Sequence, residues 1–408
     1  MDLSEGLHTL LIVSLVAALA PMIAGLLPVR VPQVVLLIVG GVLIGPEVLA
    51  WAETDTISLL SDVGLGFLFL LAGYELDLQL FNRQPGHRAL AAWFITVGIA
   101  IAVTGALAAT DFVHAFIPVA IGLTTTALGT LLPILRDNGM LRGAFGEHIL
   151  AAGAVGEFLP VVAIAIFLGT NGQFIGLMSL VFMGLLGLLL AVAPRLAKSG
   201  GRLGQIMREG EHATSQTTLR WTVALLLGLL VVADDFGLDV VLGAFLAGAI
   251  LRRWAPGDVH ALEGKLDAIG YGFFIPLFFV SSGMGLDLRS IAEAPERLLV
   301  FFVLMLACRG LPALLVYRGV LPMRQRVQLM LLSATALPLL VALSTIGLES
   351  GHMLPENAAA LVGAGVLSVI AFPALASVIG ARGSIGDAAA GPTDGTDQTD
   401  GSEVQFPR

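Results

Sequence analysis

The sequence predicts an all-α integral membrane protein of about thirteen transmembrane helices, arranged as two inverted-topology repeats. Three observations predict this fold class. Of the 408 residues, 57% are hydrophobic and 12% are charged, about half the charged share of a soluble globular protein. The apolar residues come in runs of about 20, the length with which a helix spans a bilayer. The chain also resembles itself at an offset of about 210 residues.

Apolar runs separated by polar breaks define thirteen candidate spans. The first should remain in the protein as a membrane helix, because Met1–Leu10 contains Asp2 and Glu5 and none of the basic residues that begin a cleavable signal. The spans cover residues 9–28, 33–50, 57–77, 88–109, 113–135, 145–168, 174–196, 218–234, 238–252, 266–286, 298–317, 327–347 and 357–381.

The longest polar stretch, residues 197–217, lies between spans 7 and 8 and is expected to be a cytoplasmic linker. Residues 1–196 then form the first repeat (spans 1–6) plus connecting span 7. Residues 218–382 form the second repeat (spans 8–13). Residues 383–408 are rich in Gly, Asp, Thr and Ser, so we expect a disordered cytoplasmic tail there.

Basic residues predict the orientation, because the cytoplasmic loops of membrane proteins carry an excess of Lys and Arg. One set of loops offers only Arg289 and Arg297. The other set should be cytoplasmic, which places the N-terminus outside and the C-terminus inside in a multi-pass protein of the cell membrane. Its basic residues are Arg30, Arg83, Arg88, Arg136, Arg142, Arg195, Lys198, Arg202, Arg208, Arg252, Arg253, Lys265, Arg318, Arg324 and Arg326.

Composition and missing motifs exclude several function classes. Cys308 is the single cysteine, which excludes disulfides within the chain and Cys-based metal sites. The sequence contains no basic patch that could bind nucleic acid. An intramembrane enzyme would need a nucleophile–base or metal set, and neither HExxH nor GxSxG is present. We therefore expect no enzyme activity, no cofactor and no tightly bound metal.

The self-similarity consists of three pairs of segments in the same order. GFLFLLAGYELDLQLF (66–81) resembles PLFFVSSGMGLDLRSI (276–291), and TTTALGTLLPIL (124–135) resembles SATALPLLVAL (333–343). The third pair, GGVLIG (40–45) with GAFLAG (243–248), is weaker and by itself fits chance similarity. The offset maps span 1 onto span 8, which is a shift of seven membrane crossings. Because seven is odd, the two halves have opposite orientations in the membrane. Inverted repeats are typical of alternating-access transporters.

Two ionisable residues lie deep inside predicted spans, where a charge is costly and usually functional. Glu157 is near the middle of span 6, beside Gly153 and Gly156. A buried glutamate that binds either a proton or a cation, but not both, provides the minimal chemistry of antiport. The alternative is a structural glutamate that holds helices together. The corresponding stretch of span 13 (363–373) contains no acid, which favours the functional interpretation.

Arg309 is the second such residue, in the middle of span 11. A guanidinium stays charged, so it needs a buried acid, carbonyl groups or water as partners. We expect it to offset the ends of broken helices or to pair with a carboxylate such as Glu157 or Glu147; contact with a substrate is the alternative. Most other acids lie near span ends, where caps or solvated loop residues are expected, although Asp234 and Asp235 could line an outer mouth. This group includes Asp62, Asp77, Asp234, Asp235, Asp267 and Asp287.

Spans 5 and 12 carry hydroxyls and prolines at paired positions, which predicts helices that unwind near the midplane. Their freed carbonyl groups could bind a cation, and the half-helix ends add oriented dipoles. The expected ion- and proton-binding residues are Glu157, Thr125 and Thr126, with Arg309 as a supporting charge. The expected broken-helix core is Thr124, Pro133, Ser333, Thr335 and Pro338.

Four segments resemble the monovalent cation:proton antiporter superfamily, the sodium/hydrogen exchanger domain, in its Kef-like branch. GGVLIGPEVL (40–49) is similar to the Gly-rich second-helix motif and LLAGYELDLQLF (70–81) to the third-helix segment. VLGAFLAGAIL (241–251) is similar to the Gly-Ala-Phe-x-Ala-Gly motif, and PLFFVSSGMGLDL (276–288) to the tenth-helix motif, the most specific of the four. The resemblance covers about residues 9–381.

The resemblance implies that spans 5 and 12 are crossing broken helices, that Glu157 is the ion-binding carboxylate and that the protein is a homodimer in the lipid bilayer. Gly156-Glu157 departs from the family pattern, an aspartate preceded by Asp, Asn or Gln. Arg309 matches the eleventh-helix arginine of electroneutral members. With a single buried carboxylate, we predict a secondary transporter that exchanges one monovalent cation, Na⁺ or K⁺, for one proton by alternating access. A carrier of the same architecture for an organic anion or other small solute is the alternative.

Overall fold

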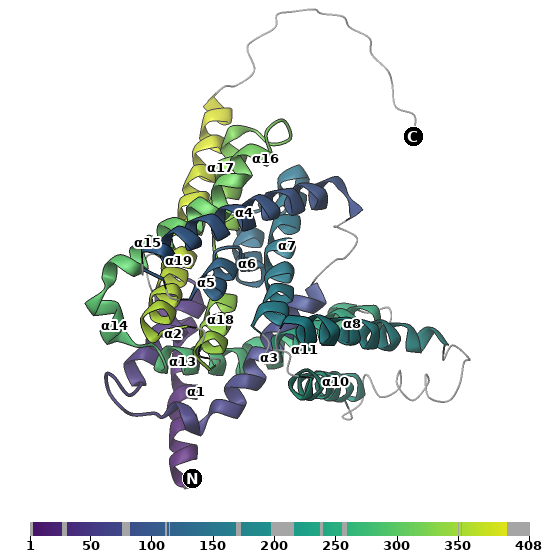
Figure 1. Ribbon diagram of the computed structural model, residues 1–408, viewed down its shortest axis with the longest axis vertical. Helices are drawn as coiled ribbons and strands as arrows, with labels where there is room; N and C mark the ends of the chain where they lie inside the picture. The colour runs from purple at the N-terminus through teal and green to yellow at the C-terminus, as the bar shows by residue number, and fades with distance from the viewer. Residues whose placement is uncertain are drawn as a thin grey trace, which may run out of the picture.

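A computed structural model describes residues 3–26, 31–75, 82–110, 112–113, 115–168, 173–196, 216–236, 240–254, 259–349, 351 and 353–389. Within these ranges the regular secondary structure is helical, with an isolated bridge between Arg318 and Leu321 and no β-strand. Figure 1 shows that the helices form two groups, one lying above the other. The linker expected at 197–217 lies almost entirely outside the described residues.

The first group, which we call the panel, combines helices from both halves of the sequence. They pack against one another in the lower part of Figure 1. The panel consists of α1 (Leu3–Leu26), α2 (Gln33–Ile44), α3 (Ser58–Glu75), α10 (Thr217–Asp235), α11 (Val240–Trp254), α12 (Val259–Ile269), the π-helical turn η3 (Gly270–Phe274) and α13 (Ile275–Met284).

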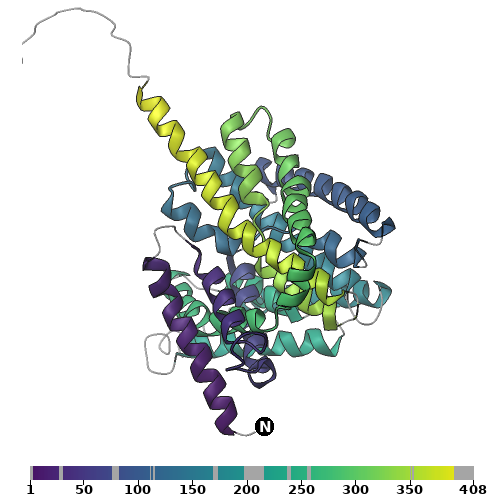
Figure 2. The same ribbon diagram turned by 90° about the vertical axis from the view of Figure 1, so that its left-hand side faces the viewer.

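The second group, which we call the bundle, likewise draws on both halves. It consists of α4 (Gln84–Ala109), α5 (Phe116–Gly122), α6 (Leu128–Asp137), α7 (Gly143–Phe167), α14 (Leu288–Glu293), α15 (Pro295–Met305), the π-helical turn η4 (Leu306–Gly310), α16 (Leu311–Val316), α17 (Met323–Ser333), α18 (Pro338–Glu349) and α19 (Pro355–Ala389). In Figure 2, α19 is the long yellow helix that runs diagonally across the bundle. Helix α8 (Gln173–Leu196) packs against α7 and α11 and so connects the groups.

Glycines of the repeated motifs bring panel helices into backbone contact. Gly73 of α3 lies against the carbonyl group of Phe245 in α11, and Gly283 of α13 lies against that of Ile38 in α2. A Cβ atom at either glycine would overlap the carbonyl oxygen. The two contacts are related by the repeat, since Gly73 and Gly283 are the glycines paired by the sequence match. Small residues at helix crossings permit this close approach in membranes.

A second pair of glycine contacts determines the register of the third, weaker sequence match, that of residues 40–45 with residues 243–248. Gly248 of α11 lies against the carbonyl group of Leu70, and Gly41 of α2 lies against that of Val280. The contacts thus make Gly41 the counterpart of Gly248, whereas the alignment of GGVLIG with GAFLAG pairs Gly45 with Gly248. The two registers differ by one helical turn, which keeps a glycine on the same face. The similarity is therefore real, but its register in the sequence alignment was wrong.

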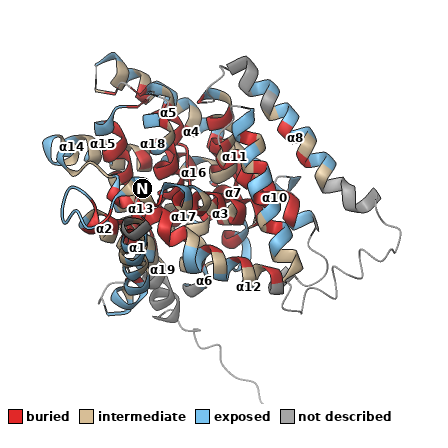
Figure 3. Ribbon diagram, turned by 90° about the horizontal axis from the view of Figure 1, so that it is seen from below, coloured by how far each residue is buried: buried red, intermediate tan, exposed pale blue. Residues whose placement is uncertain are grey.

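Nine helical segments in the described part of the chain are long and apolar enough to cross a membrane, and α2 and part of α8 are shorter apolar helices. The chain is an all-α, multi-pass membrane protein, as the sequence predicted. The count of thirteen spans stays a prediction. Leu7, Leu11, Leu15 and Leu19 form an exposed apolar stripe on α1, as expected of a lipid-facing helix. Figure 3 shows exposed residues along α1, α8 and α10 and buried residues in the middle.

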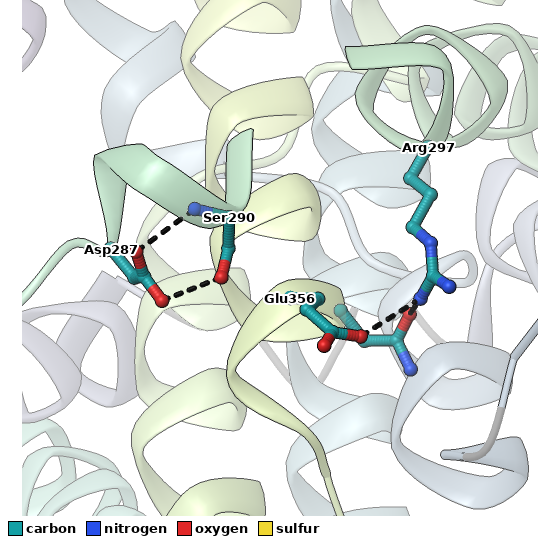
Figure 4. Close-up of polar contacts among 5 residues, drawn as sticks. Asp287, Ser290, Arg297 and Glu356 are labelled. Atoms are coloured by element: carbon teal, nitrogen blue, oxygen red, sulfur yellow. Dashed lines mark hydrogen bonds and ion pairs between the residues drawn. The ribbon is translucent and has the colours of Figure 1, made fainter. Parts of the chain in front are cut away.

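The acids that the sequence placed at span ends include helix caps. The Asp287 carboxylate accepts hydrogen bonds from the Ser290 amide at 3.0 Å and from the Ser290 hydroxyl at 2.6 Å, which makes it the N-cap of α14 (Figure 4). At the same end, Arg297 donates to Asn357 at 3.1 Å and lies 3.4 Å from Glu356, which ties α15 to α19. Asp77, the counterpart of Asp287, lies outside the described residues.

Candidate functional site

Both of the spans expected to unwind are interrupted inside the bundle. Helix α5 ends at Gly122 and α6 begins at Leu128, while α17 ends at Ser333 and α18 begins at Pro338. The Thr124 and Thr125 hydroxyls donate to the carbonyl groups of Ile121 and Gly122, at 2.7 and 2.8 Å. Such local bonds compete with helix continuation. In the second break, Pro338 disfavours a helical conformation at the preceding residue.

The two breaks cross each other in direct contact. The Thr126 hydroxyl donates to the carbonyl oxygen of Ser333 at 2.6 Å, and the Ala127 amide donates to that of Thr335 at 2.8 Å. Thr126, Ser333 and Thr335 are each at most 1% exposed. Non-helical backbone at membrane depth is stable only where protein or a water-filled cavity satisfies it. The contacts between the breaks provide part of that satisfaction, so neither break can unwind without the other.

Helix α7 carries Glu157 to the first break. The Thr126 amide donates to the Gly156 carbonyl oxygen at 2.9 Å, which holds α7 against the break. One residue on, the Glu157 carboxylate accepts hydrogen bonds from the backbone amides of Leu128 and Gly129. These amides belong to the first turn of α6, where unpaired N–H groups and the helix dipole favour an anion. Glu157 therefore lies at the N-terminal end of the second half-helix.

Arg309 lies on the other side of Thr126. Its Nε donates to the Thr126 hydroxyl at 2.9 Å and its Nη2 to the Ala152 carbonyl oxygen at 2.8 Å, and the residue is 2% exposed. The π-helical turn η4 positions it just before Pro312, a residue that cannot complete a regular helical hydrogen bond. The partners of the guanidinium are neutral, so the expected pairing with Glu157 or Glu147 is not what the structure shows.

Gly156 explains the departure of the Gly156-Glu157 pair from the family pattern. A Cβ atom at this position would lie 2.5 Å from the Thr126 hydroxyl oxygen and 2.6 Å from Nη2 of Arg309. Both distances are shorter than van der Waals contact. Because Gly156 has no side chain, Arg309 and Thr126 can both approach α7 at this position.

The second break has a neutral residue where the first has Glu157. The Ser368 hydroxyl of α19 accepts from the Ala336 amide at 3.1 Å and lies 3.0 Å from the Ala336 carbonyl oxygen. The repeat offsets of 209 and 210 place the counterpart of Glu157 at Val366 or Leu367 of α19, so Ser368 lies one or two residues beyond it. The structure thus shows the asymmetry between the halves that the sequence indicated. The Ser368 hydroxyl hydrogen-bonds to the backbone of the second break, whereas the Glu157 carboxylate faces the first break.

The other predicted site residues have different surroundings. Thr124 and Thr125 are buried, but their hydroxyls close the end of α5 rather than point to Glu157. Pro133 lies within α6, several residues after the break, and Pro338 is buried at the start of α18. The described residues contain no cluster of three or more His, Cys, Asp or Glu side chains that could hold a metal.

Glu75, at the end of α3, is a candidate that the sequence reasoning missed. It lies close enough to Glu157 for the two carboxylates to repel each other, and Asp267, Glu263, Arg136 and Arg252 are the other charged groups around it. Glu75 belongs to the panel, whereas Glu157 and Arg136 belong to the bundle. The only signal in the sequence is its place within LLAGYELDLQLF, one of the repeated motifs.

Comparisons with known proteins agree with this architecture. "Putative Na(+)/H(+) antiporter YjbQ" of Bacillus subtilis (strain 168) is 30% identical over 317 residues, which are 73% of this chain and 50% of YjbQ. This chain thus spans about half the length of YjbQ. "Probable Na(+)/H(+) antiporter 3" of Methanocaldococcus jannaschii is 25% identical over 285 residues, 68% of this chain and 71% of that protein.

A solved structure shares the fold. The sodium proton antiporter MjNhaP1 from Methanocaldococcus jannaschii matches with a TM-score of 0.69 at 17% identity, over 97% of this chain and all of that one. The family model for the transmembrane sodium/hydrogen exchanger matches residues 13–378. The chain therefore belongs to the transmembrane sodium/hydrogen exchanger family.

Proposed function

We propose that this protein is a secondary active transporter that exchanges a monovalent cation, Na⁺ or K⁺, for a proton. The observation that carries the proposal is a carboxylate, Glu157, held at the N-terminal end of a half-helix inside a crossing of two broken helices. Family membership and the names of the relatives, which describe Na⁺/H⁺ antiporters, support the same reaction. The proposed action is transport and not an enzymatic reaction.

Glu157 is the proposed exchange site. A carboxylate that is negatively charged attracts a cation, and the same carboxylate neutralised by a proton does not. Because the two ligands use the same oxygens, binding one displaces the other. Exchange of one cation for one proton follows if Glu157 is the group that changes its protonation state in each cycle. Thr126 and the carbonyl groups of the break supply further oxygens nearby.

Alternating access would arise from movement of the bundle relative to the panel. Hydrogen bonds from Arg309, Thr126 and Ala127 link α6, α7, η4 and both breaks, all of which lie in the bundle. The bundle can therefore carry Glu157 as one body. The panel, held together by backbone contacts at its glycines, offers a surface against which it moves. Rigid-body movement of this kind about a fixed site is the general mode of inverted-repeat transporters.

Orientation, boundaries and assembly complete the proposal. The excess of basic residues places the loop between α6 and α7, with Arg136 and Arg142, in the cytoplasm. The N-terminus is then outside, the C-terminus inside, and the membrane is the cell membrane. The halves are residues 1–196 and 218–382. Helix α19 continues to Ala389, past the boundary expected at residue 382. A homodimer in the bilayer is the proposed assembly.

Proteoliposomes that contain a pH-sensitive dye test the function. Na⁺, K⁺ and Li⁺ are added in turn to wild type and to Glu157→Gln, and proton flux is recorded. We expect cation-evoked flux in the wild type and none in Glu157→Gln, which is nearly the same size but cannot change charge. Glu147→Gln, on the same helix and outside the site, is the matched control and should transport normally. Absence of flux in folded wild-type protein, for every cation, would refute the proposal.

A further inference from the structure

Tyr271 lies in η3, the π-helical turn that joins α12 to α13 in the panel. Pro276 follows within one turn, and because it has no N–H group it cannot complete the regular helical bond to Gly272. Arg309 occupies the same kind of turn, before Pro312. Turns of this type are often found at functional sites because they displace a side chain from the regular helical register. Both turns direct a polar side chain toward the break between α5 and α6.

The Tyr271 hydroxyl reaches from the panel to the first turn of α6 in the bundle. It lies 3.7 Å from the position that a Cβ atom would take at Gly129, and the Gly129 amide is one of the two that bind the Glu157 carboxylate. The charged groups whose fields reach this hydroxyl are Glu75, Glu157, Asp267 and Arg136. The hydroxyl thus lies at the boundary between the two helix groups, within the electrostatic reach of three carboxylates and one guanidinium.

Tyr271 also lines a cavity of about 350 Å³ between α1, α2 and the panel turn, whose wall includes Ser14, Gln33 and Leu37. The residue as a whole is 44% exposed. The hydroxyl is the part of Tyr271 that faces the candidate ion site.

We infer that Tyr271 is a cation-binding residue, whose hydroxyl oxygen coordinates the cation between Glu75 and Glu157. This inference rests on the proposed function. A hydroxyl oxygen donates a lone pair to a cation while its O–H group donates a hydrogen bond to a carboxylate, so it can replace a water molecule lost from the cation. Because Tyr271 belongs to the panel and Glu157 to the bundle, the bridge forms only when the two groups have the relative position seen here.

Tyr271→Phe removes the hydroxyl oxygen and keeps the ring. We expect the cation concentration for half-maximal flux to rise about tenfold, which corresponds to about 1.4 kcal/mol. The flux at saturating cation should stay within about twofold of wild type, because Glu157 still exchanges the proton. The preference among Na⁺, K⁺ and Li⁺ should also change. A tyrosine that only fills space would leave the half-maximal concentration and the ion preference unchanged.

Tyr74→Phe is the matched control, since its buried hydroxyl has no hydrogen-bond partner in the described part of the protein and belongs to the same panel. It should transport like wild type. A second measurement, the rise in melting temperature caused by the preferred cation in detergent, should be smaller for Tyr271→Phe than for Tyr74→Phe. Equal affinity, ion preference and thermal shift in the two variants would overturn the inference. Absence of flux in the wild type would instead overturn the proposed function.

Discussion

Glu157 and Arg309 both lie at the break between α5 and α6, yet they do not pair with each other: Thr126 contacts Arg309 through its hydroxyl and Gly156, the residue before Glu157, through its amide. The guanidinium of Arg309 donates to the Thr126 hydroxyl, which itself donates to Ser333 across the crossing. The Glu157 carboxylate binds the amides that follow Thr126, at the start of α6. Because the bonds of Arg309 go to neutral oxygens, Glu157 remains available to neutralise a cation or a proton.

Gly156→Ala should disrupt this arrangement. The added methyl group would lie 2.5 Å from the Thr126 hydroxyl and 2.6 Å from Arg309 Nη2, so both bonds must shift. Overpacking of this kind costs about 1–3 kcal/mol, and we expect a lower melting temperature together with loss of flux. Gly98→Ala in α4 is the control, because no atom lies within 4 Å of its added methyl group. A Gly156→Ala protein with wild-type stability and flux would contradict the assigned packing.

Arg309→Lys tests whether the guanidinium acts by geometry or by charge alone. Lysine keeps the positive charge but cannot donate from two fixed positions to Thr126 and Ala152 at once. Leaving one buried acceptor without a partner costs about 1–3 kcal/mol, so the melting temperature should fall. Arg318→Lys at an exposed position is the control and should melt like wild type. If Arg309→Lys melts at the wild-type temperature, the positive charge alone suffices and the two hydrogen bonds are dispensable.

Glu75→Gln should weaken cation capture without abolishing exchange. Glu75 is the panel carboxylate whose field reaches Glu157, so it attracts the cation toward the site but does not itself need to change charge. We expect a several-fold rise in the half-maximal cation concentration and nearly normal maximal flux. Electrostatic attraction is screened by salt, so the difference from wild type should shrink as inert salt is added. Asp55→Asn, at an exposed position beyond the other end of α3, should have no effect.

Asp287 provides a pH-dependent contribution to stability outside the membrane-spanning segments. The two hydrogen bonds from Ser290 hold the pKa of the Asp287 carboxyl below its usual range. A lowered folded-state pKa favours the folded protein at pH values above the unfolded-state pKa, and this contribution is lost as pH falls through the folded-state pKa. Asp287→Ala should therefore lower the melting temperature at neutral pH, by a cap worth about 1 kcal/mol.

The same variant should approach wild-type stability in acid, where the wild-type carboxyl is protonated. Asp287→Asn keeps an acceptor oxygen and should recover most of the neutral-pH stability without its pH dependence. Melting curves recorded from neutral to acid pH measure both effects. A constant difference between wild type and Asp287→Ala across that range would show that the charge of the cap plays no part.

The sequence by itself determined the fold class, the inverted repeat, the two broken spans and the burial of Arg309. These features are local or periodic: the length of an apolar run fixes a span, and hydroxyls with prolines weaken a helix at a given position. Glu157 was identified for the same reason, because an acid in the middle of an apolar run is conspicuous. The family comparisons confirm the membership that four short motifs indicated.

Only the tertiary structure decided which groups meet. Arg309 contacts Thr126 across 183 residues of sequence, and its neutral partners could not be distinguished in advance from Glu147 or Glu157. Glu75 was not singled out from the sequence, because only the packing of panel and bundle brings its charge within electrostatic reach of Glu157. The register of Gly41 against Gly248 was likewise undetermined, since a shift of one turn preserves the apolar face. Helix formation is encoded within each run of residues, whereas a charge finds its partner only when helices distant in sequence cross.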